Sequence, residues 1–239
     1  MKILVIPDVH LKPEMFDRAA KIMRTGNFDN SLFLGDLVDD WGWENNLQLY
    51  EKTFDALEAY MTEFPDALYC YGNHDLSYIL GRMESGYSYS CAIYNRERFE
   101  KIVKMMEDRL AVVHLIDETV FCHGGIMYDF IDTYLSDLPD KRDTVFAIND
   151  LRLALMWDND SPVWARPQYE PGEAWDGYYQ VVGHTPVSKP LRQNKILTLD
   201  TFSTNPDGTP IGPWTFIVVD TVTGKAWECS DNGILGKEV

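Results

Sequence analysis

Five short clusters of polar residues could do metal chemistry, and each follows a run of apolar or β-prone residues. They are Asp8-Val9-His10, Gly35-Asp36-Leu37-Val38-Asp39-Asp40, Gly72-Asn73-His74-Asp75, His123-Gly124-Gly125 and Gly183-His184-Thr185-Pro186. Four of the 5 histidines of the chain lie in these clusters. Because open α/β sheets place their sites at the carboxyl ends of strands, we expect these side chains to meet.

The residue types are those of a site for two metal ions. Imidazole combined with carboxylate and amide oxygens suits first-row divalent ions such as Mn, Fe, Zn or Ni better than Ca. Asp8 and His10 can point the same way at a strand end, and the carboxylate of Asp36 can bridge two ions. The shell of the second ion would be completed by Asn73, His123 and His184. Two such ions, ~3.5–4 Å apart, can hold a phosphate and lower the pKa of a bridging water towards ~7.

One histidine is set apart from the metal ligands. His74 directly follows Asn73, so its side chain should project differently from that ligand. We interpret His74 as the proton donor to a leaving oxygen, oriented by Asp39 through its other ring nitrogen. The fifth histidine, His114, lies in an apolar run outside the clusters, and we expect it to be a structural side chain.

Alternating strands and helices should position the clusters. Strands are expected at Lys2–Ile6, Ser31–Leu34, Ala67–Tyr71, Thr119–Cys122 and Tyr178–Val182. Helices are indicated by Pro13–Arg24 and by apolar stripes over Leu47–Met61, Phe99–Leu110 and Val145–Leu155. Later strands at Lys195–Thr201 and Thr215–Asp220, with turns at Asp207-Gly208 and Thr223-Gly224, indicate an antiparallel finish. We predict one domain over residues 1–239, with two packed sheets and helices outside.

Composition narrows the class of protein. The 239 residues have a formal net charge of −17, which disfavours nucleic acid polymers as partners. No apolar run approaches the ~18 residues of a membrane span, so we expect no membrane association. The first residues lack the pattern of a signal peptide, and the 4 cysteines have no CxxC spacing. Both features favour a cytoplasmic protein with reduced thiols.

The five clusters, in this order over about residues 2–200, resemble the calcineurin-like metallophosphoesterase superfamily. Within it, the chain is most similar to the serine/threonine phosphoprotein phosphatases, including their bacterial and phage members. The resemblance implies a four-layer α/β/β/α sandwich with two mixed sheets and two divalent ions, with manganese as first choice. It assigns Asp8, His10 and Asp36 to the first ion, and it assigns Asp36, Asn73, His123 and His184 to the second. The acid would be His74, paired with Asp39.

The chain departs from the phosphatase pattern at several positions. Leu11 replaces a glycine, Asp75 replaces a glutamate, and Asp40 stands where the family has an arginine that grips phosphate. The stretch Trp164-Ala165-Arg166-Pro167 resembles a W-x-R-P stretch of small bacterial phosphatases, whose arginine contacts phosphate. We therefore expect Arg166 to replace the missing arginine, with Asn73 as a second phosphate contact.

We expect hydrolysis of phosphate monoesters, with phosphoserine or phosphothreonine as the family's substrate class, in a small phosphorylated molecule or a phosphopeptide. A hydroxide bridging the two ions would attack phosphorus in line. Pro186 favours this branch over nuclease-like and cyclic-nucleotide diesterase branches. Three alternatives stay open: a nucleotidase or dinucleoside polyphosphate hydrolase using Arg82, Arg96 and Arg98, a phosphodiesterase, and a non-enzymatic scaffold. The scaffold is disfavoured because the ligands and the acid are all present.

Overall fold

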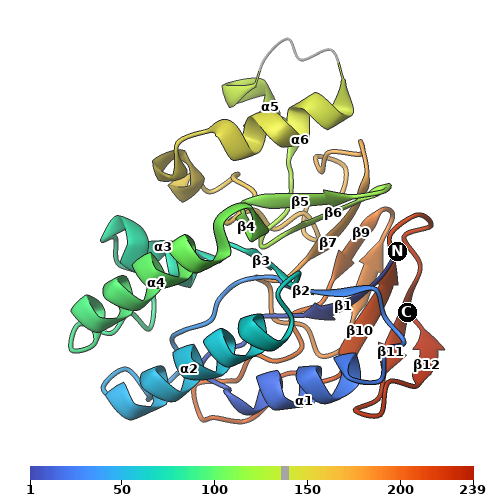
Figure 1. Cartoon of the computed structure of the whole chain (residues 1–239). Helices are drawn as coiled ribbons and strands as arrows, with labels where there is room; N and C mark the ends of the chain where they lie inside the picture. Colours follow the sequence, from blue (N-terminus) through green and yellow to red (C-terminus); the bar gives the residue numbers. More distant parts are fainter. Residues whose placement is uncertain (136–139) are drawn as a thin grey trace.

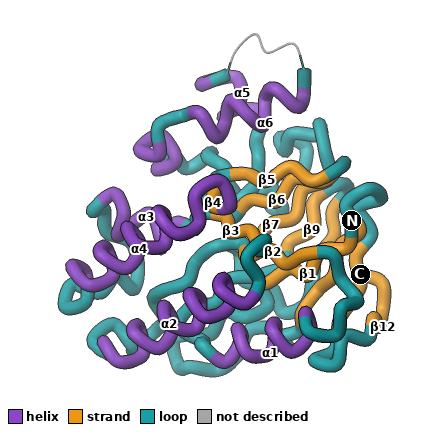
Figure 2. The backbone as a smooth tube through the Cα atoms, viewed as in Figure 1, coloured by secondary structure: helices purple, strands orange, loops and turns teal. Residues whose placement is uncertain are grey.

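Two β-sheets lie face to face at the centre of the molecule, with helices on the two outer sides (Figures 1 and 2). The computed structural model describes residues 1–135 and 140–239. The 7-stranded sheet has the order β12-β11-β10-β1-β2-β3-β4, and the 5-stranded sheet has the order β5-β6-β7-β9-β8. The predicted α/β fold with two mixed sheets in four layers is confirmed.

Each sheet combines parallel and antiparallel strands. The first contains β1 (Lys2–Ile6), β2 (Asn30–Phe33), β3 (Leu68–Cys70), β4 (Leu110–Ala111), β10 (Phe216–Asp220), β11 (Ala226–Cys229) and β12 (Leu235–Glu238). The second contains β5 (Val113–Ile116), β6 (Thr119–Cys122), β7 (Tyr179–Val182), β8 (Leu191–Gln193) and β9 (Ile196–Thr198). β1 to β4 pair in parallel, as do β6, β7 and β9, whereas β10 to β12 pair antiparallel. The predicted antiparallel finish is present from β10 to β12. β9, which is shorter than the predicted Lys195–Thr201, instead pairs in parallel with β7 and antiparallel only with β8.

Helices cover both outer faces of the sandwich. They are α1 (Glu14–Met23), α2 (Leu47–Glu63), α3 (Asn73–Leu80), α4 (Ala92–Met106), α5 (Tyr128–Tyr134) and α6 (Lys141–Asp150). In Figure 1, α1 and α2 lie along the 7-stranded sheet, and α5 and α6 lie over the 5-stranded sheet. Among the described residues, no helix has the length and apolar character needed to cross a membrane.

Buried strands explain why the two sheets stack. In β1, Ile3 and Val5 contribute to the apolar cluster between the sheets, whereas Leu4 and Ile6 contribute to the cluster beneath the helices. In β6, Phe121 faces the other sheet, and its neighbours face the layer that contains α5 and α6. Because both faces are covered, these strands are continuous apolar runs without polar alternation.

Two of the predicted helical stripes extend too far. α4 ends at Met106, a 3₁₀ turn with Glu107 at φ 48° follows, and Leu110 begins β4. The stripe from Val145 to Leu155 is also broken, because α6 ends before Leu155, which lies in a separate 3₁₀ helix. Val145 and Leu155 nevertheless pack on the same apolar cluster. Apolar spacing reports burial and therefore did not reveal these breaks.

Candidate metal centre

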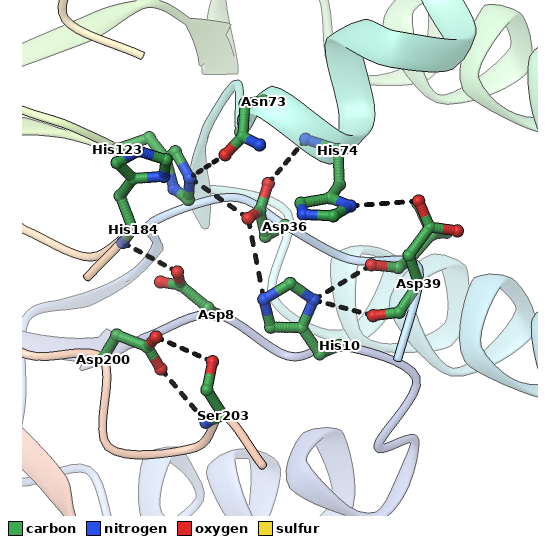
Figure 3. Close-up of polar contacts among 12 residues, drawn as sticks. Asp8, His10, Asp36, Asp39, Asn73, His74, His123, His184, Asp200 and Ser203 are labelled. Atoms are coloured by element: carbon green, nitrogen blue, oxygen red, sulfur yellow. Dashed lines mark hydrogen bonds and ion pairs between the residues drawn. The ribbon is translucent and has the colours of Figure 1, made fainter. Parts of the chain in front are cut away.

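The five clusters meet at one edge of the sandwich, as Figure 3 shows. Asp8 follows β1, Asp36 follows β2, and Asn73 follows β3 as the first residue of α3. His123 and His184 follow β6 and β7 of the other sheet. The carboxyl ends of parallel strands share an edge, so both sheets contribute side chains to one site.

The carboxylate of Asp36 is the centre of the arrangement. Its ligand atoms, with those of Asp8 and His10, lie within 4.8 Å of one another, and the same holds for Asp36 with His123 and His184. The two groups share only Asp36. The cluster therefore has the donor set of two neighbouring cation sites joined by one carboxylate.

His123 is held in the tautomer that a metal ligand requires. Its Nδ1–H donates to the carbonyl of Leu34 at 2.8 Å, which leaves the lone pair of Nε2 facing inward. Nε2 lies 2.9 Å from Asn73 Oδ1 and 3.2 Å from Asp36 Oδ2. Three acceptor atoms thus face one another, which requires a cation or a proton between them. Burial lowers the pKa of His123, but Asp36 and Asp8 outweigh it and raise the pKa to about 9.

His10 has the same orientation towards the other group. Its Nδ1–H donates to the carbonyl of Asp39 at 2.8 Å, and its Nε2 lies 3.6 Å from Asp36 Oδ2, beyond hydrogen-bond length. Four site residues adopt the left-handed backbone region that only glycine enters freely: His10, Asp36, Asp39 and His184, at φ 43°, 51°, 64° and 60°. Such strain is concentrated where side chains must be aimed at a site.

Two buried polar atoms at the site have no hydrogen-bond partner among the described residues: Asp8 Oδ1 and His184 Nε2. Asp8 Oδ2 accepts a bond of 2.7 Å from the backbone N–H of His184. Burial and the nearby Asp200 raise the pKa of Asp8, whereas burial and His123 lower the pKa of His184. A buried carboxylate oxygen and a buried imidazole nitrogen without partners are costly unless a cation binds them. The residues present therefore fit a pair of divalent ions.

The predicted acid His74 lies beside this cluster, and its partner is Asp39. Its Nδ1 lies 3.0 Å from Asp39 Oδ2, while Asp39 Oδ1 accepts bonds from the hydroxyls of Tyr50 at 2.7 Å and Tyr78 at 2.6 Å. Burial lowers the pKa of His74, but Asp36 and Asp39 raise it to about 9, so the ring keeps its proton at neutral pH. Tyr50 and Tyr78, which fix the carboxylate, were not singled out from the sequence.

Asp75 has a structural role in aiming the site loops. It accepts bonds from the backbone N–H groups of Asp36 at 3.1 Å, Leu37 at 3.0 Å and Gly72 at 2.9 Å, and from the hydroxyl of Tyr69 at 3.0 Å. Burial, followed by Asp36, raises its pKa to about 6. Asp75 therefore joins the loop after β2 to the loop after β3.

Asp200 is a site residue that sequence reasoning missed. It is fully buried beside Asp8, and it accepts bonds from the N–H of Ser203 at 3.1 Å and its hydroxyl at 2.7 Å (Figure 3). Burial raises its pKa. The available signal was its place directly after the apolar run 196–199, the same position that the five clusters occupy.

A cavity of about 220 Å³ opens above the cluster, lined by His10, Asp36, Asp39, Asp40, Trp41, Asn73, His74, Glu84, Ser85, Gly86, Trp164, Arg166, His184, Pro186, Ser203 and Thr204. Arg166 is therefore at the site, where its Nη1 donates to Thr185 Oγ1 at 2.8 Å. Asp40 is occupied otherwise: it accepts bonds from Lys12 at 2.9 Å and Thr204 at 2.6 Å. His114 is buried away from the lining, and its Nε2–H donates to a backbone carbonyl at 2.9 Å, as expected of a structural side chain.

Comparison with known proteins agrees with this geometry. A family model described as calcineurin-like phosphoesterase matches residues 1–197. The chain belongs to this family. A search of curated proteins finds no match to this phosphoesterase. Its fold is similar to that of a cold-active protein-tyrosine phosphatase from a psychrophilic Shewanella species, with TM-score 0.64 and 16% identity over 98% of this chain and 79% of that one. It is also similar to a protein serine/threonine phosphatase from Saccharomyces cerevisiae, with TM-score 0.53 and 19% identity over 92% and 72% of the two chains.

Removal of metal from this phosphoesterase is expected to lower its thermal stability. Each ion at about one hundred times its Kd stabilises the folded state by about 2.7 kcal/mol, so two ions correspond to a Tm difference of about 10–20 °C for a domain of this size. Because an ion must displace the proton of His123, whose pKa is about 9, the Tm gain should grow from about pH 6 to about pH 8. Scanning fluorimetry of the protein in chelator and in excess manganese measures this difference in Tm at each pH. Equal Tm values in both states would contradict a metal centre here.

Proposed function

We propose that this phosphoesterase hydrolyses phosphate monoesters with the help of two divalent ions, manganese being the first candidate. The observation that carries the proposal is the pair of ligand groups joined by Asp36, with the His74–Asp39 pair at the wall of the same cavity. Asp8 and His10 with Asp36 would hold one ion. Asp36 with Asn73, His123 and His184 would hold the other. When bound, the ions would neutralise phosphate charge and make a water molecule acidic enough to attack at neutral pH.

The chain's own residues then divide the remaining tasks. Arg166 and Asn73 bind the phosphate oxygens, and the guanidinium has the planar fork that matches them. His74 donates its proton to the departing ester oxygen, and Asp39 holds the ring with its proton-bearing nitrogen outward. Tyr50 and Tyr78 fix the carboxylate of Asp39, so the acid is oriented before substrate binds.

A monoester fits this cavity better than the polyphosphate alternative. The arginines considered for a dinucleoside polyphosphate are absent from the described cavity lining. Arg98 is paired with Asp55 and Glu58, Arg96 donates to the carbonyl of Tyr78, and Arg82 lies over the ring of Trp157. We therefore favour a substrate with one terminal phosphate, such as phosphoserine or phosphothreonine.

Matched chromogenic substrates test the proposal. With manganese, para-nitrophenyl phosphate should be hydrolysed faster than bis-para-nitrophenyl phosphate, because a dianionic terminal phosphate makes more contacts with two cations and an arginine. A faster diester reaction would assign the phosphodiesterase alternative. A folded protein that binds two ions but hydrolyses neither substrate would contradict the proposed activity.

Replacing Arg166 by Ala is expected to lower kcat/KM for para-nitrophenyl phosphate by about 10–100-fold, since a charge-assisted hydrogen bond contributes about 1.5–3 kcal/mol. Inhibition by inorganic phosphate should weaken in parallel. Arg166→Lys keeps the charge but not the fork and should recover only part of the loss. Arg152→Ala, an arginine outside the cavity lining, is the control. An Arg166→Ala enzyme with normal phosphate inhibition would remove this residue from the phosphate site.

A further inference from the structure

One wall of the cavity is attached to the His74–Asp39 pair. Residues 81–91 connect α3 to α4, and within them the N–H of Ser88 donates at 2.7 Å to the hydroxyl of Tyr78, which itself bonds to Asp39. A Cβ at Gly86 would lie 3.6 Å from Asp39 Cβ, so this backbone passes close to the carboxylate. The connection therefore holds Glu84 and Ser85 in the wall of the cavity that His74 also lines.

Trp41 belongs to the same wall. Its segment is bonded to the 81–91 connection, because Ser90 Oγ donates to Asn45 Oδ1 at 2.8 Å and Ser88 Oγ donates to the carbonyl of Glu44. The indole of Trp41 lines the cavity and is 46% exposed. It is therefore available to a ligand.

The carboxylates of this wall differ in their availability. Asp40 forms an ion pair with Lys12 and accepts a hydrogen bond from Thr204. Glu84 accepts a bond of 2.8 Å from Ser85, and within residues 1–135 and 140–239 it has no basic partner. Arg166, the arginine of the lining, donates to Thr185 and to the carbonyl of His184. A free carboxylate and an exposed indole together attract a cation, through charge and through the face of the ring.

The place of this pair determines which part of the substrate it would meet. His74 protonates the departing oxygen in the proposed reaction, so the leaving alcohol must lie on the side of His74. The charge of Glu84 acts on His74, and Trp41 is two residues from Asp39, the partner of His74, so we place both on that side. We propose that the enzyme selects phosphate monoesters whose leaving alcohol carries a positive charge close to the ester oxygen. The inference rests on the proposed monoesterase function and names its substrate class.

The chemical step is unchanged by this selection. The oxygen of water forms a bond to phosphorus and one proton of that water passes to solvent. The bond between phosphorus and the ester oxygen breaks, the alcohol leaves with the proton from His74, and His74 regains a proton from solvent. The products are inorganic phosphate and a cationic alcohol. Two sources supply such an alcohol: a small amino alcohol, or a phosphoserine or phosphothreonine next to a basic residue in a peptide.

Isosteric pairs of substrates separate charge from shape. Choline phosphate and 3,3-dimethylbutyl phosphate differ in one atom, a quaternary nitrogen against a carbon. Two phosphothreonine peptides, one with arginine and one with citrulline beside the phosphothreonine, likewise differ in charge but little in shape. For at least one pair, the cationic member should have a kcat/KM about fivefold higher or more, as expected for a partly exposed cation beside a carboxylate and an indole. Glu84→Gln should reduce that ratio towards one.

Glu100→Gln is the matched control. Glu100 is exposed on α4 and outside the cavity lining, so this variant removes the same charge from the protein without changing the wall. The ratio of kcat/KM between the cationic and the neutral substrate should be the same in Glu100→Gln as in the unsubstituted enzyme. If both variants reduce it equally, the preference arises from the overall charge of −17 and the assignment to Glu84 is wrong.

A binding measurement keeps this inference distinct from the proposed activity. The manganese-loaded His74→Asn protein should bind the cationic member of at least one pair about fivefold more tightly than the neutral member. The pairs are choline phosphate with 3,3-dimethylbutyl phosphate, and the arginine peptide with the citrulline peptide. Adding Glu84→Gln to the His74→Asn protein should remove this difference in affinity. A preference limited to one pair identifies the source of the alcohol. If the unsubstituted enzyme does not hydrolyse para-nitrophenyl phosphate, the proposed activity is contradicted but the proposed selectivity is not. No preference in binding, for either pair, would overturn the selectivity.

Discussion

Replacing Asp36 by Asn should cost at least about 10³ in kcat/KM, because both proposed ions lose their shared carboxylate and the charge stabilisation of several kcal/mol that they supply. Asp36 Oδ2 is the oxygen that faces both His10 and His123. Manganese bound per chain, measured by elemental analysis after gel filtration, should fall from about two to below one.

Two features make the Asp36→Asn result specific. An asparagine oxygen can still accept the bond from the N–H of His74 that Asp36 Oδ1 accepts at 2.9 Å, so the loop should fold. Asp17→Asn, an exposed position on α1, removes the same charge far from the site and should keep full activity and metal content. An Asp36→Asn protein that retains two ions and normal turnover would show that the ions do not share this carboxylate.

The His74→Asn variant should lose activity according to the leaving group. Removal of a general acid costs about 10²–10⁴-fold when the departing alcohol is a poor leaving group, as in phosphoserine. Para-nitrophenolate needs little protonation, so the loss for para-nitrophenyl phosphate should be much smaller. Steady-state rates with both substrates measure the difference. Metal content should be unchanged, because His74 belongs to neither ligand group.

The dependence on pH gives a second test of His74. Asp36 and Asp39 raise the pKa of His74, and two ions bound at Asp36 would offset its part, so the acid form is lost as the pH rises through a pKa that Asp39 keeps raised. For an alkyl phosphate, kcat/KM should therefore fall on the alkaline side, and this fall should disappear in His74→Asn. Asp39→Asn removes one of the charges that raise the pKa of His74, so the alkaline fall of this variant should move to lower pH.

In the leaving-group test, equal losses of activity of His74→Asn with phosphoserine and with para-nitrophenyl phosphate would indicate a structural role for this ring.

Local patterns carried most of the information on the strands and on the position of the site. β1 and β6 have the predicted bounds, because a short buried strand ending at polar residues is encoded within a few positions. The same local pattern placed Asp8, Asp36 and His123 at strand ends. It also predicted that one sheet edge would collect them, since the connections between parallel strands return the chain to the same side.

The remaining features depend on contacts between distant segments. Tyr50 was interpreted as part of an apolar helical stripe, and only the packing of α2 directs its hydroxyl to Asp39. Asp200 lies beside Asp8 because β9 pairs with β7 in the second sheet. Lys12, which forms an ion pair with Asp40, is 28 positions away from it in the sequence. No residue spacing within one segment encodes such pairs.

The division of the site between the two sheets also sets when it can form. Asp8 accepts a bond from a residue 176 positions later, and the ligands of β6 and β7 reach Asp36 only after the sheets have stacked. Loop closure over such separations is slow relative to local folding. During synthesis, the site stays incomplete until His184 has emerged and the second sheet has docked. Binding of metal ions by both ligand groups would therefore occur late in folding, after the two sheets have stacked.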